Sequence, residues 1–161
     1  RAAARGAREV LCVDSSTTAL EQATTNATLN GVGDRVRTEQ GDAFEVLKSL
    51  RETRERFDVV IVDPPAFIKR RKDFKEGALA YRRLNEMAMQ VLERDGLLVS
   101  CSCSQLFSRD VLVHTLLQGS RHLDRNLLML EQGRQGPDHP VLPAIPETDY
   151  LKAIFARVLP A

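Results

Sequence analysis

Apolar residues along the chain gather in short runs that are separated by segments with helical spacing. The most apolar run is "FDVVIVD" (57–63), and "REVLCVD" (8–14) and "GLLVSCS" (96–102) are similar to it. Short runs that stay apolar nearly throughout are typical of parallel strands covered on both faces. We therefore predict three buried strands at these positions.

Weaker patterns complete the order of elements. "DRVRTEQGD" (34–42) and "NLLMLEQ" (126–132) predict two further strands, and the alternation in "YLKAIFARV" (150–158) predicts an antiparallel or edge strand. Thr18 and Glu21 have the spacing of a capping box, which favours a helix in this segment. The helices that we expect cover residues 15–31, 43–56, 84–95 and 108–120.

This alternation of strands and helices predicts an α/β protein. We expect a Rossmann-like sheet that is mostly parallel and has one C-terminal antiparallel strand. The chain opens with "RAAARGA", which is typical of the last turns of a helix closed by Gly6. Because a domain rarely begins inside a helix, we expect residues 1–161 to form one partial domain that lacks its first strand.

The composition is that of an ordinary globular domain. The 161 residues are 43% hydrophobic and carry a net charge of +1. An anionic partner would therefore meet a local basic patch and not an overall positive field. No stretch is long and apolar enough to predict a membrane span, and the odd count of three cysteines favours reduced thiols in the cytoplasm.

Acidic residues end three of the predicted strands, at Asp14, Asp42 and Asp63. In open α/β sheets, ligands bind beyond the carboxyl ends of the strands, so we expect the three acids along one edge. Asp14, beside Ser15, can accept ribose hydroxyls, and Asp42, before Ala43-Phe44, can accept from an adenine amino group. Each acid could instead cap the helix that follows it. Together they predict an adenosine site, but no glycine-rich loop identifies the cofactor.

Several motifs, in order along the chain, make a family resemblance specific. They are "VLCVDSS", "NATLNG", "GDAF", "FDVVIVDPPAF", "YRRLNEMAMQVL", "GLLVSCSCS" and "DHPVLPAIPETDYLK". The chain resembles the class I S-adenosylmethionine-dependent methyltransferases, and among them the bacterial 23S ribosomal RNA 5-methylcytosine methyltransferases. The resemblance covers nearly the whole chain. It implies that a PUA-type RNA-binding domain and the glycine loop lie upstream of these residues.

The resemblance also implies S-adenosyl-L-methionine as cofactor and ribosomal RNA as partner. The cofactor-binding residues that it implies are Asp14, Ser15, Asp42, Ala43, Phe44, Asp63 and Pro64. Cys103 would be the catalytic nucleophile, and Asp63 would act on the target base as well. We expect Cys12 and Cys101 to be core residues, which is the usual fate of a free cysteine.

The chemistry explains why such an enzyme needs a cysteine. Carbon 5 of cytosine becomes nucleophilic only after a thiolate adds to carbon 6, and the thiol must later leave again. An acid at Asp63, near N3 and the exocyclic amine, would stabilise the added ring. Many RNA 5-methylcytosine enzymes carry a second cysteine after the proline of this motif, where this chain has Ala66. The group that removes the carbon 5 proton therefore stays open.

A basic run follows the third acid. Lys69, Arg70, Arg71 and Lys72 are expected to contact RNA phosphates, with Arg82 and Arg83 extending the patch, although most such runs are solvated loops. Tyr81 could stack on a base, or it could pack within a helix with Asn85, one turn away.

Two other functions remain open from the sequence. The chain could belong to a ribosomal RNA methyltransferase that acts on a guanine or amino nitrogen, which needs no thiol adduct. It could also be a non-catalytic RNA-binding fragment. The sequence indicates no membrane partner and leaves a homodimer open.

Overall fold

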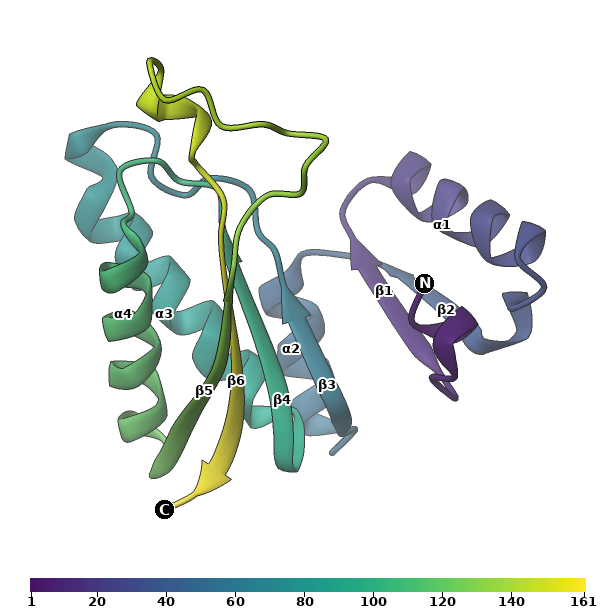
Figure 1. Ribbon diagram of the computed structural model, residues 1–161. Helices are drawn as coiled ribbons and strands as arrows, with labels where there is room; N and C mark the ends of the chain where they lie inside the picture. Colours follow the sequence, from purple (N-terminus) through teal and green to yellow (C-terminus); the bar gives the residue numbers. More distant parts are fainter. The chain divides into compact units, whose positions relative to one another are not determined.

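The structure, a computed structural model, describes all 161 residues, Arg1–Ala161 (Figure 1). The chain divides into two compact units, Arg1–Ser49 and Leu50–Ala161. The boundary falls inside helix α2 (Ala43–Glu52).

The first unit contains a pair of parallel strands, β1 (Val10–Asp14) and β2 (Val36–Gln40), connected by helix α1 (Thr17–Leu29). Ser16 caps α1, because its hydroxyl accepts a hydrogen bond from the Ala19 amide at 3.3 Å. The capping box expected from Thr18 and Glu21 was therefore wrong. Its buried core is small and consists of Ala3, Ala27 and Val32, with Val10 and Val36 packed against it.

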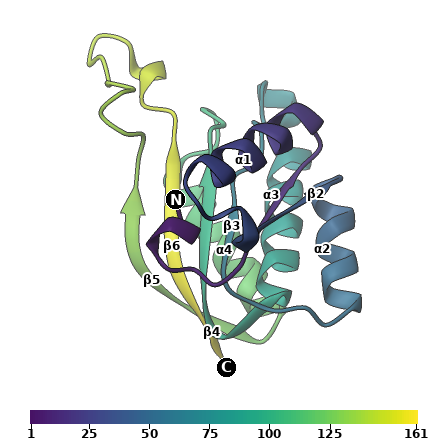
Figure 2. The ribbon, with the colours of Figure 1, turned by 90° about the vertical axis from the view of Figure 1, so that its right-hand side faces the viewer.

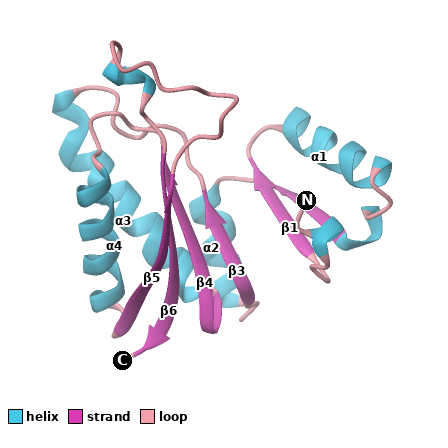
Figure 3. Ribbon diagram, in the orientation of Figure 1, coloured by secondary structure: helices cyan, strands magenta, loops and turns pink.

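The second unit is a four-stranded sheet with the strand order β3-β4-β6-β5 (Figure 3). Strand β3 is parallel to β4, whereas β6 is antiparallel to both β4 and β5. Strands β3, β4 and β5 therefore point the same way, and this confirms the predicted α/β sheet with one antiparallel C-terminal strand. The elements of this unit are β3 (Phe57–Val62), α3 (Phe74–Gln90), β4 (Leu92–Ser102), α4 (Arg109–His122), β5 (Arg125–Gly133) and β6 (Lys152–Pro160).

Helices α3 and α4 cover one face of this sheet, as Figures 1 and 2 show from two directions. The core between them is closed: Leu84, Leu98, Leu112 and Val158 are each at most 2% exposed. Helix α3 ends at Gln90, and Leu92 already lies in β4, so the predicted helix end near Asp95 was wrong. No helix of the protein is both long and apolar enough to cross a membrane.

Gly77 allows the segment after β3 to lie directly against α3. A Cβ atom at position 77 would stand 2.3 Å from a side-chain carbon of Ile68 and 2.9 Å from the carbonyl oxygen of Phe67. Both distances are too short for any contact, and the second involves backbone that cannot rotate away. Only glycine fits at position 77 without displacing its neighbours, although glycine weakens a helix interior.

We predict that Gly77→Ala lowers the free energy of unfolding by about 1–3 kcal/mol, because the added methyl group displaces the Phe67-Ile68 backbone. Urea denaturation would measure the change. Gly119→Ala in α4 is the matched control, since its Cβ would meet the flexible Glu86 side chain at 3.0 Å. Equal stability of the two variants would contradict the prediction.

Candidate active site

The carboxyl ends of β3 and β4 bring two predicted catalytic residues to one edge. Asp63 directly follows β3, Cys103 directly follows β4, and the two strands are parallel neighbours with Val62 opposite Ser100. The Cys103 Sγ lies 3.9 Å from the carbonyl oxygen of Pro64, in the position of a weak S–H donor. The second unit therefore joins the Asp-Pro turn and the predicted nucleophile in one place.

Three buried hydroxyl groups lie behind this edge and form what we call the hydroxyl cluster: Tyr81, Ser102 and Ser104. The Tyr81 hydroxyl is 2.9 Å from that of Ser104 and accepts from that of Ser102 at 3.0 Å. The Ser104 hydroxyl also accepts from the Ile68 amide at 3.1 Å. The cluster thus connects the segment after β3 to the residues on both sides of Cys103.

Tyr81 is a packing residue. Its side chain has no exposed surface, and its ring stacks on Phe107 with centroids 4.6 Å apart and planes 10° apart. The carbonyl oxygen of Tyr81 accepts from the Asn85 side chain at 2.8 Å, as expected for partners one helical turn apart. Base stacking by Tyr81 was therefore a wrong alternative, and helix packing is the right one.

The three cysteines are free thiols, and each is half-buried. Burial raises the pKa of Cys101 to about 11, and the nearby charge of Asp63 adds to this rise. A thiol in this environment stays protonated at neutral pH, so Cys101 cannot supply the thiolate that nucleophilic addition requires. This environment agrees with the expectation that Cys101 is a structural residue.

We predict that alkylation of Cys101 by iodoacetamide accelerates about tenfold per pH unit between pH 7 and pH 10. The reason is that only the thiolate reacts, and its fraction rises tenfold per unit below the raised pKa of about 11. Mass spectrometry of the peptide that contains Cys101 would follow the rate. A plateau already at pH 8 would contradict the prediction.

The predicted cofactor-binding acids Asp14 and Asp42 lie in the first unit, at the carboxyl ends of β1 and β2. The Gly41 amide donates to the Asp14 carbonyl at 3.1 Å and the Gln40 side chain donates to the Ser15 carbonyl at 3.3 Å, so the two strand ends are joined. β1–β2 and β3–β4–β6–β5 are separate sheets, because no strand of this chain is hydrogen-bonded to both. Asp14 and Asp42 thus lie at strand ends of the first unit and Asp63 at a strand end of the second unit, and a single edge with all three acids stays a prediction.

Both acids of the first unit also hold local backbone. Asp14 Oδ1 accepts from the Ser16 amide at 2.7 Å, and Asp42 Oδ1 accepts from the Phe44 amide at 2.9 Å, at the start of α2. The capping interpretation is thus confirmed for Asp42. In both residues the second oxygen, Oδ2, has no protein donor and the side chain is exposed. Each carboxylate is held in direction while one oxygen stays open to a ligand, and Ala43-Phe44 follows directly in α2.

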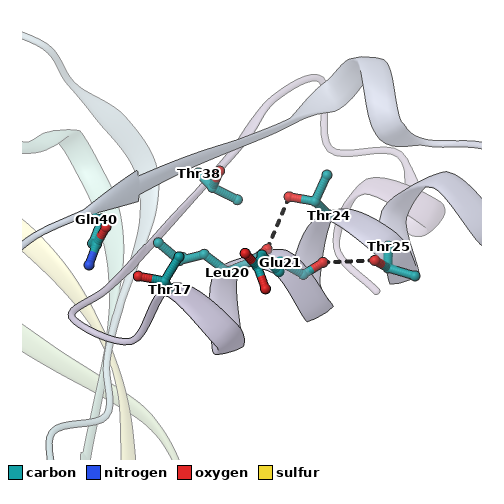
Figure 4. Close-up of a pocket in the computed structure, with 7 residues that line it drawn as sticks. All are labelled: Thr17, Leu20, Glu21, Thr24, Thr25, Thr38 and Gln40. Carbon is teal, nitrogen blue, oxygen red and sulfur yellow. Dashed lines mark hydrogen bonds between the residues drawn. The ribbon is translucent and has the colours of Figure 1, made fainter.

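A separate pocket of about 500 Å³ lies between α1 and β2 of the first unit (Figure 4). The hydroxyls of Thr24 and Thr25 point back to the helix backbone, donating to the Leu20 and Glu21 carbonyls at 3.0 and 2.9 Å. None of the predicted cofactor-binding residues lines this pocket, so it does not define the cofactor site. Its lining residues are Thr17, Leu20, Glu21, Thr24, Thr25, Thr38 and Gln40.

The basic run lies in the exposed segment that leads from Asp63 to α3. Arg70 forms an ion pair with Asp73 at 3.1 Å, whereas Lys69, Arg71 and Lys72 are exposed beside it. Farther along α3, the Nε of Arg82 lies 3.5 Å from the Glu86 carboxylate, and the same side chain lies close to Gly119 of α4. Arg83 is exposed on the same helix. Arg82 is thus already engaged in helix packing.

Lys152, the first residue of β6, was not among the predicted site residues. Its side chain is only 7% exposed, and its Nζ donates to the Ser104 carbonyl at 2.7 Å. The ladder between β4 and β6 places Lys152 directly opposite Ser102. The motif "DYLK" was noted, but only the observed strand order puts this lysine next to the cysteine strand.

The irregular segment 134–151 connects β5 to β6 and begins at the same edge, because β5 points the same way as β4. Thr148 organises it: its hydroxyl accepts from the Leu142 amide at 2.8 Å and donates to the Ile145 carbonyl at 2.7 Å, and its carbonyl accepts from the Gln135 side chain. The segment therefore has internal structure above the candidate site, as Figure 1 shows at the top of the sheet.

Solved structures of methyltransferases have the same fold. SMU.776, described as a candidate methyltransferase and solved in complex with SAH, has a TM-score of 0.80 at 18% identity and aligns over 94% of this chain and 40% of that chain. NSun6 from Pyrococcus horikoshii, solved with SFG, has a TM-score of 0.62 at 17% identity over 93% of this chain and 40% of that chain. The fold is therefore the Rossmann-like fold of class I methyltransferases.

The sequence comparison identifies the family. The model of the family described as "Conserved hypothetical protein 95" matches residues 1–108, and the chain belongs to this family. A curated relative, ribosomal RNA large subunit methyltransferase I of Erwinia tasmaniensis, is 35% identical over 153 residues, which are 94% of this chain and 39% of the relative. The chain thus spans about two-fifths of the length of that protein.

Proposed function

We propose that this chain carries the catalytic residues for methylation of carbon 5 of a cytosine in large-subunit ribosomal RNA. The reaction would proceed through a covalent adduct with Cys103. The observation that carries the proposal is the placement of Cys103 and Asp63 at adjacent strand ends, with the Cys103 Sγ 3.9 Å from the Pro64 carbonyl. The name of the Erwinia relative supports ribosomal RNA as the substrate.

The cofactor is S-adenosyl-L-methionine, which supplies the methyl group when it is bound. In the proposed assignment Asp14 and Ser15 hold its ribose, and Asp42 with Ala43-Phe44 holds its adenine. The fit rests on the open Oδ2 atoms of Asp14 and Asp42, whose Oδ1 atoms fix the direction of each carboxylate. Asp63 and Pro64 border both the methyl donor and the target base.

Cys103 Sγ acts as the nucleophile in the proposed reaction. As a thiolate it would form a bond to carbon 6 of the cytosine, and the ring electrons would move toward carbon 5. Carbon 5 would take the methyl group as its bond to the sulfonium sulfur breaks, which leaves a neutral thioether. Loss of the carbon 5 proton and cleavage of the S–C6 bond then return the thiolate and the aromatic ring. Asp63 stabilises the positively charged ring by a hydrogen bond near N3 and the exocyclic amine.

The target base must leave any stack to reach Cys103, so the substrate is single-stranded or flipped at this position. The exposed cations beside Asp63 suit such a substrate, because they can hold the phosphates on either side of the base. We assign this role to Lys69, Arg71 and Lys72. Arg82 has its partner in Glu86 and is left out of this set.

We predict that large-subunit ribosomal RNA containing 5-fluorocytosine forms a stable covalent complex with the intact protein when S-adenosylmethionine is present. Fluorine at carbon 5 cannot leave as a proton does, so the S–C6 bond persists. Denaturing electrophoresis would detect the complex. Cys103→Ser should abolish it, and the matched control Cys101→Ser should retain it, since the raised pKa of Cys101 keeps that thiol protonated.

If the Cys103→Ser variant still methylates RNA, the cytosine-5 assignment is contradicted. It would favour transfer to a guanine or amino nitrogen, where no thiol adduct is needed. Absence of methylation by the unaltered protein, with RNA still bound, would favour a non-catalytic RNA-binding role.

We predict that replacing Lys69, Arg71 and Lys72 together by serine weakens RNA binding about tenfold or more at moderate salt. The triple change should also reduce the slope of log K against log salt, since each phosphate contact contributes about 0.7–0.9 to it. Filter binding at several salt concentrations measures both effects. The control replaces three exposed cations elsewhere, Lys48, Arg94 and Arg121. Equal losses in both triple variants would show a non-specific charge effect and contradict the assignment.

A further inference from the structure

Lys152 is a buried cation beside the proposed nucleophile. It is the first residue of β6, faces Ser102 across the ladder, and donates from Nζ to the carbonyl of Ser104 at 2.7 Å. Lys152 therefore lies opposite Ser102 and contacts Ser104, the two residues on either side of Cys103. Its side chain is only 7% exposed, which is rare for a lysine without a charged partner.

One hydrogen bond to a backbone carbonyl does not account for a buried ammonium group. The ammonium has three donors, and the Ser104 carbonyl is the acceptor that the structure gives it, so two N–H bonds point to no protein acceptor. A neutral side chain could hold the same carbonyl without the cost of burying a charge. A negative group near Nζ would offset that cost.

The groups that act electrostatically on Lys152 come from the start of α4, the segment before β6 and the turn after β4. Arg109, at the start of α4, is a like charge, although its guanidinium also donates to the Gly133 carbonyl at 3.0 Å. Asp149, in the segment before β6, is an opposite charge. Cys103, after β4, is the remaining group and becomes an opposite charge as a thiolate.

Burial has the largest effect on Lys152 and lowers its pKa. Among the neighbouring groups, in decreasing order of effect, the Cys103 thiolate raises this pKa, Arg109 lowers it and Asp149 raises it. Electrostatic interaction is mutual, so an ammonium that is stabilised by the thiolate stabilises the thiolate in return. This coupling agrees with the geometry of the buried side chain.

We propose that Lys152 is a positioning residue whose ammonium group favours the thiolate form of Cys103 and orients the turn that carries it. The proton balance is simple: the thiol proton leaves Sγ for water, and the Lys152 ammonium keeps its three N–H bonds. The inference deepens the proposed function and rests on it, because it gives Cys103 the form that addition to carbon 6 requires.

The test measures the reactivity of Cys103 itself, without RNA or methyl transfer. The intact protein would be alkylated with iodoacetamide between pH 6 and pH 10, and the peptide that contains Cys103 would be quantified by mass spectrometry. In Lys152→Met, we expect alkylation of Cys103 to slow about tenfold near neutral pH. Alkylation of Cys101 in the same samples serves as the internal reference.

Two further variants separate charge from structure. Lys152→Arg keeps the cation and should restore most of the alkylation rate. Lys152→Gln keeps a donor for the Ser104 carbonyl but no charge, and it should behave like Lys152→Met. Lys48→Met removes an exposed lysine of α2 and should change nothing. Circular dichroism and a thermal melt of each variant would report folding.

Unchanged Cys103 alkylation in folded Lys152→Met or Lys152→Gln would overturn the proposal. Unfolding of both uncharged variants, with Lys152→Arg folded, would also overturn it, because the lysine would then serve the fold alone. These outcomes are distinct from failure of the proposed function. If Cys103→Ser retained methylation while Lys152 still controlled Cys103 alkylation, the adduct chemistry would be wrong and the electrostatic coupling right.

Discussion

The hydroxyl cluster is the constraint on which the candidate active site depends. Tyr81, Ser102 and Ser104 come from α3, β4 and the turn after β4, and the Ile68 amide from the segment after β3 also binds to them. Buried hydroxyls are costly unless they are hydrogen-bonded, so the three groups can be buried only together. Their mutual satisfaction fixes the two turns that carry Asp63 and Cys103.

The packing around the cluster makes this constraint rigid. The stacked rings of Tyr81 and Phe107 leave no exposed surface, and Gly77 lets the Phe67-Ile68 backbone lie directly against α3. A small displacement of α3 would therefore displace the Asp-Pro turn by a similar amount. Helix α3 in this way determines where Asp63 and Cys103 stand.

Much of the fold could be predicted from the sequence, because apolar runs and turn residues act locally. The strands, their order along the chain and the strand-end positions of Asp14, Asp42 and Asp63 followed from such runs. The helix cap at Ser16 was missed, since neighbouring serine and threonine residues offer several capping hydroxyls. Lys152 was also missed, because its place beside Ser102 depends on β6 entering between β4 and β5. No local pattern encodes a pairing between strands that are fifty positions apart.

The antiparallel return of β6 has a consequence for how this protein can change over evolution. Both ends of segment 134–151 are anchored to strands of one sheet, and the segment stands over the edge that carries Cys103. Its length and composition can vary without shifting the register of any strand. New recognition properties can therefore arise in this segment by insertion or deletion, while Asp63 and Cys103 beneath it keep their geometry.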